Sequence, residues 1–251
     1  MACIDQLSLD GIASPSSINK NINLPQDQDL NQESLNKQDP IKNTIQFSIV
    51  HTLQCKSCHS KSIHSEMFRD LSLFFPPPSS GESDPFRSRI DKIDLHVMLQ
   101  HFFSPDSVDY TCASCSCTQA TLTHLIESLP STLLFHFNRF EVSPSFGNGG
   151  GGGLYKRNDA VHVPSTLHLG DFVHSDCLER DRLEYRLSGI VSHQGISMRR
   201  GHYVFSKVDT STVGQKDVLW TQYDDAKVNR GIVGLAPKLA SELYVVVYER
   251  I

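Results

Sequence analysis

Apolar and polar residues alternate along several short segments of this chain, as they do in strands that bury one face. The clearest alternation is at five positions that face one way, Leu183, Tyr185, Leu187, Gly189 and Val191. We expect Gly195 to mark the turn after this strand. In the next strand, one face is predicted to carry His202, Val204 and Ser206, and the other Tyr203, Phe205 and Lys207. A third short segment leads to Asp224 and Asp225.

Earlier in the chain the same pattern predicts further strands and one helix. Strands are expected over 45–53, around 66–74 and over 129–140. From Asp94 the apolar residues follow the i, i+3, i+4, i+7, i+8 spacing of a helix that lies on a core, at Leu95, Met98, Leu99, Phe102 and Phe103. Asp94 is expected to cap this helix, and Ser104-Pro105 to end it.

The amino-acid composition indicates two regions, residues 1–44 and residues 45–251. Residues 1–44 contain no aromatic residue and are rich in Asn, Gln, Ser and Asp, which predicts a disordered polar tail. A single globular domain is expected over 45–251. Residues 147–153, six glycines and one Asn, predict a flexible insert and not a phosphate-binding loop, because no Lys-Ser/Thr follows them.

Charge and targeting signals exclude some classes of partner. The net charge is −5 with a pI near 6.2, so we expect neither nucleic acid nor an anionic membrane as a partner. No apolar run long enough to span a membrane occurs, and no secretory signal is evident, which predicts an intracellular protein. The sequence does not predict an oligomeric state.

Four of the seven cysteines form two Cys-x-x-Cys pairs, Cys55 with Cys58 and Cys112 with Cys115. Two such pairs can supply four thiolates in tetrahedral geometry, so a structural zinc site is predicted. Cys117 could replace Cys115, and His59 could compete as a ligand. A redox role is less favoured, because neither pair begins an evident helix.

The residues around His202 could form part of a catalytic site that uses a nucleophile. If the strand of His202 pairs with the segment that ends in Asp224 and Asp225, a carboxylate can orient the imidazole, which is two thirds of a nucleophilic triad. Gly201 is expected to leave open space next to His202. With twelve histidines in the chain, a purely structural His–carboxylate contact is the alternative.

Several motifs, in this order, resemble those of the ubiquitin-specific proteases, which are papain-like cysteine deubiquitinases. The motifs are Phe47-x5-Leu53-x-Cys55-x-x-Cys58, Glu66-x-Phe68-x-x-Leu71-Ser-Leu73, Leu133-x-x-His136-Phe-x-Arg139-Phe140, Tyr185-x-Leu-x-Gly-x-Val-x-His193-x-Gly195, Gly201-His202-Tyr203, Trp220-x-x-Tyr223-Asp224-Asp225-x-x-Val228 and Tyr244-Val-Val-Val-Tyr248-Glu-Arg250. The resemblance covers about residues 45–251.

The resemblance implies an α+β fold, mostly antiparallel, with zinc-ribbon-like fingers at about 45–130 and a palm at about 131–251. It implies that His202 is the general base and Asp224 its orienting partner. Asp225 would support that pair, with His193 and Gly201 framing the site. The implied zinc is architectural, and the implied partner is ubiquitin or a ubiquitinated protein.

The family's nucleophile is not found in this sequence. The family supplies it from a Gly-Asn-Thr-Cys-Tyr box followed by a helical thumb, and no such box occurs here. Cys3 lies in the predicted tail and Cys177 in a charged loop. We therefore expect an incomplete fold that does not hydrolyse ubiquitin conjugates alone, although thiol-dependent hydrolysis is the family activity. The alternative is a catalytically dead module that binds ubiquitin or acts as a scaffold.

Overall fold

The computed structural model describes residues 44–76, 92–142, 154–197 and 200–251. The chain divides into two compact units, 1–38 and 39–251, and every described residue belongs to the second. Apart from Thr44, the predicted tail lies outside the described residues, as does the Gly-rich insert at 147–153. No helix within the described residues is long and apolar enough to cross a membrane.

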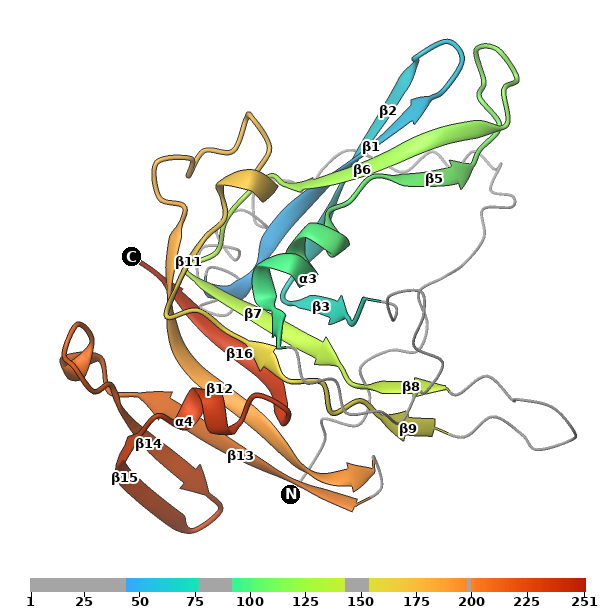
Figure 1. Ribbon diagram of the computed structural model, residues 1–251. Coiled ribbons are helices and arrows are strands. Elements are labelled where there is room, and N and C mark those ends of the chain that lie inside the picture. The colour runs from blue at the N-terminus through green and yellow to red at the C-terminus, as the bar shows by residue number, and fades with distance from the viewer. Residues whose placement is uncertain (1–43, 77–91, 143–153, 198–199) are drawn as a thin grey trace, which may run out of the picture. The chain divides into compact units, whose positions relative to one another are not determined.

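A four-stranded antiparallel sheet carries both Cys-x-x-Cys pairs, and we call it the finger sheet (Figure 1). Its strands, in spatial order, are β2 (Lys61–Phe68), β1 (Phe47–Cys55), β6 (Gln119–Ile126) and β5 (Asp106–Asp109). Phe47 and Ile49 are fully buried, whereas residues 51–54 are only partly buried. The sheet therefore has a root embedded in the core and a tip near solvent.

The remaining long strands form an eight-stranded sheet, which we call the palm sheet (Figure 1). Its spatial order is β15 (Lys227–Val233), β14 (Leu219–Asp224), β13 (Arg200–Val208), β12 (Glu184–Ser197), β16 (Leu243–Arg250), β7 (Thr132–Asn138) and β3 (Leu71–Phe74), and β11 (Thr166–His168) also pairs with β12. All these pairings are antiparallel except that of β3 with β7. The predicted mostly antiparallel architecture is confirmed.

Helices within the described residues are few and short. The helix α3 (Leu95–Phe102) begins where the sequence predicts, because the side chain of Asp94 accepts a hydrogen bond from the His96 backbone N–H at 2.8 Å. Leu95, Met98 and Leu99 are the buried residues of this helix. The other short elements are β4 (Ile93–Asp94), β8 (Phe140–Val142), β9 (Leu154–Lys156), β10 (Val161–His162), the 3-10 helices η1 (Gly170–Phe172) and η2 (Thr210–Thr212), and α4 (Leu235–Lys238).

A buried guanidinium ties the palm sheet to the segment that follows β9 and to the segment that precedes β16. Arg139 is fully buried between β7 and β8 and donates hydrogen bonds to four backbone carbonyl oxygens, those of Leu243, Arg157, Asp159 and Ala240. Burial lowers the pKa of Arg139 to about 10, so the group is still charged at neutral pH. A buried charge with this many acceptors is a stabilising bridge.

Two predicted strands differ from the observed ones. The strand expected around 66–74 is interrupted at Arg69 and Asp70, so that β2 joins the finger sheet while β3 pairs with β7 in the palm sheet. The second difference is in β12, where the register shifts between Leu187 and Gly189 and again after Val191. The first shift adds a residue, Ser188, to β12 and reverses the faces of the strand, so Ile190 and not Val191 is fully buried. The second shift adds its residue, Tyr244, to β16.

The prediction of a turn at Gly195 was also wrong. Gly195 lies within β12, which continues to Ser197, and has a φ of +133°. A register shift between Gln194 and Ser197 accompanies it. A β-bulge explains the glycine, because only glycine adopts this backbone conformation without strain.

Candidate functional site

His202 and Asp224 are brought together by the antiparallel pairing of β13 with β14, in which Phe205 faces Tyr223. The Nε2 atom of His202 lies 2.5 Å from Oδ1 of Asp224, and the two side chains are 42% and 35% exposed. Because Val204 and Ser206 are buried and Tyr203 and Phe205 are exposed, His202 lies on the inward face of β13. The alternation predicted that it shares a face with Val204 and Ser206.

The acidic pair raises the basicity of the imidazole. The hydrogen bond to Asp224 is the main reason that the pKa of His202 is raised; the charges of Asp224 and Asp225 add to it, and desolvation opposes it. Within the described residues, Nδ1 of His202 makes no hydrogen bond. A neutral ring that donates from Nε2 to Asp224 therefore presents a bare Nδ1 that can accept a proton.

Asp225 follows directly in the turn between β14 and β15, in a left-handed conformation with φ of +50°. Its carboxylate, that of Asp224 and the His202 ring each offer an oxygen or nitrogen within 4.8 Å of one another. These three groups could also coordinate a cation, but the hydrogen bond already engages Nε2. We interpret the group as an acid–base arrangement.

His193 and Gly201 pack against each other on the face of the sheet opposite to the His202 side chain. His193 on β12 is buried, and its ring contacts the rings of Tyr203 and Phe140 at 4.8 and 5.6 Å. A Cβ at Gly201 would collide with this ring. The space next to Gly201 is therefore filled by His193, and the prediction of open space there was wrong. Burial and the nearby Lys156 lower the pKa of His193, which keeps its ring neutral.

Lys156 supports this part of β12, and no pattern in the sequence marked this role. Its ammonium group is buried and donates to the backbone carbonyls of His193 and Gly195, each at 2.7 Å. Those carbonyls flank Gln194, which pairs with His202 across the strands. Lys156 therefore anchors the strand end next to the imidazole.

The four predicted cysteine ligands converge at the tip of the finger sheet. The sulfur atoms of Cys55, Cys58, Cys112 and Cys115 all lie within 4.8 Å of one another. Cys55 and Cys115 are 3.6 Å apart, as are Cys58 and Cys112. Tetrahedral Zn–S bonds of about 2.3 Å place sulfurs about 3.8 Å apart, so the cluster could hold a metal ion with little adjustment.

The structure distinguishes the alternative ligands. Cys115 belongs to the four-sulfur group and Cys117 does not; the Cys117 thiol instead lies 3.7 Å from the carbonyl oxygen of Gln119. His59 is also outside the group. Chiefly because of its hydrogen bond with Ser60, Cys112 has a pKa lowered to about 6. The hydrogen bond from the Cys117 backbone is outweighed by the effects of the Cys58 thiol, of burial and of the Cys55 thiol, which raise the pKa of Cys115 to about 11.

The remaining described cysteine, Cys177, is far from His202. It is buried, and its thiol acts electrostatically on Tyr185, which lies nine residues before Gln194 on β12. At about 3.3 Å per residue, Tyr185, the residue on which Cys177 acts, lies roughly 30 Å along β12 from the partner of His202. Burial raises the pKa of Cys177, which disfavours the thiolate. Cys3 lies outside the described residues.

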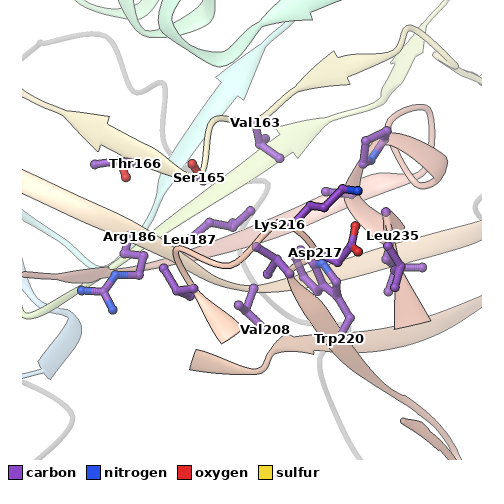
Figure 2. A pocket seen from close by; sticks show the side chains of 16 residues that line it. Val163, Ser165, Thr166, Arg186, Leu187, Val208, Lys216, Asp217, Trp220 and Leu235 are labelled. Atoms are coloured by element: carbon purple, nitrogen blue, oxygen red, sulfur yellow. The ribbon is translucent and has the colours of Figure 1, made fainter. Parts of the chain in front are cut away.

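An apolar cavity of about 310 Å³ lies at the other end of β13 (Figure 2). Its walls include Leu187, Val208, Trp220 and Leu235, with Lys216 and Asp217 beside them. Val208 is six residues beyond His202 on β13, or about 20 Å along the strand. The cavity is therefore separate from the His202 site.

Comparisons with known proteins agree with this geometry. The family model described as "Ubiquitin carboxyl-terminal hydrolase" matches residues 5–248. Ubiquitin carboxyl-terminal hydrolase 37 of Gallus gallus is 29% identical over 158 residues, which are 63% of this chain and 14% of that protein. Ubiquitin carboxyl-terminal hydrolase 1 of Arabidopsis thaliana is 31% identical over 134 residues, 51% of this chain and 12% of that protein. The chain thus spans less than a fifth of these curated relatives.

Solved structures show the same fold. A yeast SAGA DUB module matches with a TM-score of 0.66 and 21% identity, covering 90% of this chain and 46% of that chain. The SAGA Ubp8/Sgf11/Sus1/Sgf73 DUB module bound to ubiquitin aldehyde matches with a TM-score of 0.64 and 23% identity, covering 86% and 44%. Together with the family model, which matches nearly the whole sequence, the comparisons establish that this chain belongs to the ubiquitin carboxyl-terminal hydrolase family, among the ubiquitin-specific proteases.

Proposed function

We propose that this chain carries the base and orienting acid of a thiol-dependent deubiquitinase, and that it does not hydrolyse ubiquitin conjugates by itself. The observation that carries the proposal is the His202–Asp224 contact of 2.5 Å, with Nδ1 of the ring left available. In this role Nδ1 takes the proton of a cysteine thiol and returns it to the leaving amine, while Asp224 fixes the tautomer. Asp225 and His193 support the arrangement without touching the reacting atoms.

The proposal of inactivity rests on the cysteines. Four of the six described cysteines lie in the finger cluster, Cys117 lies beside it, and Cys177 is distant and buried. Loss of the nucleophile removes nearly all covalent catalysis, so the isolated chain should hydrolyse at background rate.

A ubiquitin derivative with a C-terminal electrophile tests this directly. Incubated with the purified full chain, it should give no covalent adduct above that formed by His202→Ala protein. A His202-dependent adduct would overturn the proposal of inactivity, and peptide mapping of the modified cysteine would identify the nucleophile. Mapping to Cys3 would assign the nucleophile to the segment outside the described residues.

The second candidate is a ubiquitin-binding or scaffold module without catalytic function, and the same distribution of cysteines favours it. The related DUB module binds ubiquitin aldehyde, and ubiquitin is accordingly the proposed partner of this chain. Titration of labelled ubiquitin should show saturable binding at micromolar concentration. Absence of binding up to high micromolar concentration would contradict the ubiquitin-binding role in both candidates.

We also propose that the metal of the finger cluster is zinc and that its role is structural. Four sulfur ligands close the tetrahedral shell and leave no position for water or substrate, which distinguishes a structural from a catalytic zinc. The reducing environment that keeps such thiols available is consistent with the predicted intracellular location, in the cytoplasm or nucleus.

A further inference from the structure

Two histidines on neighbouring strands of the finger sheet each bury a ring nitrogen that has no hydrogen-bond partner. His51 on β1 and His124 on β6 lie directly opposite each other in the strand register, with their rings 5.6 Å apart and edge-on. Among the described residues, Nε2 of His51 and Nδ1 of His124 are buried and unpartnered. A buried polar group without a hydrogen bond lowers the free energy of unfolding by about 1–3 kcal/mol. Two such groups side by side therefore suggest that a ligand binds between them.

A hydrogen bond at Nε2 determines the tautomer of the neutral His124 ring. Nε2 of His124 donates to the backbone carbonyl of Phe102 at 2.8 Å. Nδ1 therefore carries a lone pair when the ring is neutral. An imidazole that donates one N–H to a backbone carbonyl and presents the other nitrogen bare is the usual arrangement of a metal-binding histidine. Burial is the main reason that the pKa of His51 is lowered, which keeps its lone pair available as well.

Both rings line a cavity of about 370 Å³ between the finger sheet and the end of α3. His101 and Asp106 line the same cavity, and Oε2 of Glu66 lies 3.7 Å from Nε2 of His51. Asp106 and Glu66 can balance the charge of a cation. Within the described residues, His51 and His124 are not part of a group of three or more His, Cys, Asp or Glu whose ligand atoms all lie within 4.8 Å of one another. Water, or one of these carboxylates after a side-chain rotation, would complete the coordination.

We propose that His51 Nε2 and His124 Nδ1 bind a second transition-metal ion of the zinc class, distinct from the cysteine cluster. The two sites lie on the same face of β1, because residues 51 and 55 are four positions apart, or about 13 Å. One ion would then fasten the finger sheet at its tip and the other near its root. This proposal is independent of any catalytic activity.

The number of bound Zn²⁺ ions tests the proposal. The full chain, prepared without a histidine tag, is loaded with Zn²⁺, passed through a desalting column and measured by native mass spectrometry. We expect two equivalents in the unaltered chain and one in the double variant His51→Gln/His124→Gln. Two single variants are matched controls and should keep both ions. The first is His64→Gln, because His64 is exposed and faces His51 from β2, the neighbour of β1 on the side away from β6. The second is Asp225→Asn, which removes a carboxylate from the His202 group.

A second readout does not depend on the double variant folding. In the unaltered chain, the second equivalent of Zn²⁺ should shift the ¹⁵N resonances of His51 Nε2 and His124 Nδ1. A single equivalent would overturn the proposal and indicate a bridging water molecule. Retention of two ions by the double variant, loss of the second ion from Asp225→Asn, or histidine shifts confined to His202 would also overturn it.

Discussion

The ring of His193 occupies the space into which any side chain at position 201 would project. We therefore expect Gly201→Ala to force His193 or its strand to move, at a cost of about 1–3 kcal/mol in the free energy of unfolding, as overpacked sites show. Urea unfolding measures this cost. In a His193→Ala background the same substitution should cost clearly less, because the obstructing ring is gone. Equal costs in both backgrounds would contradict the packing described.

The pKa of His202 should depend more on Asp224 than on Asp225. Asp224 supplies the hydrogen bond and the larger charge effect, whereas Asp225 acts only through its charge. In an NMR titration, Asp224→Asn should therefore lower the pKa of His202 towards the ordinary value near 6.5, and Asp225→Asn should lower it less. A larger effect of Asp225→Asn would exchange the roles assigned to the two carboxylates.

The same contact makes stability depend on pH. Because the folded-state pKa of His202 is raised, its contribution is fully present below the unfolded-state pKa near 6.5 and is lost as pH rises through the folded value. The destabilisation caused by His202→Gln should therefore be larger at pH 5.5 than at pH 8.5. Chemical denaturation at the two pH values measures the difference, and a destabilisation that increases with pH would contradict the stated protonation linkage.

Metal binding at the finger tip should require Cys55 but not Cys117. Cys55 is buried within the four-sulfur group, whereas Cys117 lies outside it. Cys55→Ser should abolish metal binding at this cluster and increase amide hydrogen exchange in residues 55–60 and 110–118, where the knuckles lie. Cys117→Ser is the matched control and should leave both properties unchanged. Loss of the metal from Cys117→Ser would restore the alternative ligand assignment.

Arg139→Met should destabilise the fold by about 3–5 kcal/mol, since four carbonyl oxygens, two buried and two partly buried, would lose their donor. Arg139→Lys should recover part of this loss, because an ammonium group supplies three donors without the planar geometry of the guanidinium. Thermal unfolding ranks the variants. Equal melting temperatures of the Met variant and the unaltered chain would show that the bridge has no net effect on stability.

Local patterns predicted the elements whose side-chain periodicity is regular. The apolar stripe identified α3 with its cap at Asp94, and alternation assigned the faces of β13. The two Cys-x-x-Cys pairs identified the finger cluster, because this spacing suits two ligands of one metal ion. The contact of His202 with Asp224 followed once the two strands were assumed to pair.

The features that were missed depend on contacts remote in sequence. Alternation cannot locate the register shifts of β12, since they are set by its pairing with β16 and β13. The break at Arg69 and Asp70 is visible only when β2 and β3 are seen to join different sheets. Lys156 and Arg139 bind backbone carbonyls, which every residue possesses, so no side-chain motif marks their partners.

The position of β16 restricts when this domain can assemble on the ribosome. Residues 243–250 lie in the middle of the palm sheet, with β12 on one side and β7 on the other (Figure 1). During synthesis, β12 and β7 therefore cannot complete their backbone hydrogen bonds to β16 until β16 has emerged from the exit tunnel. Throughout that interval the nascent chain presents open strand edges, which can pair with other chains unless they are shielded.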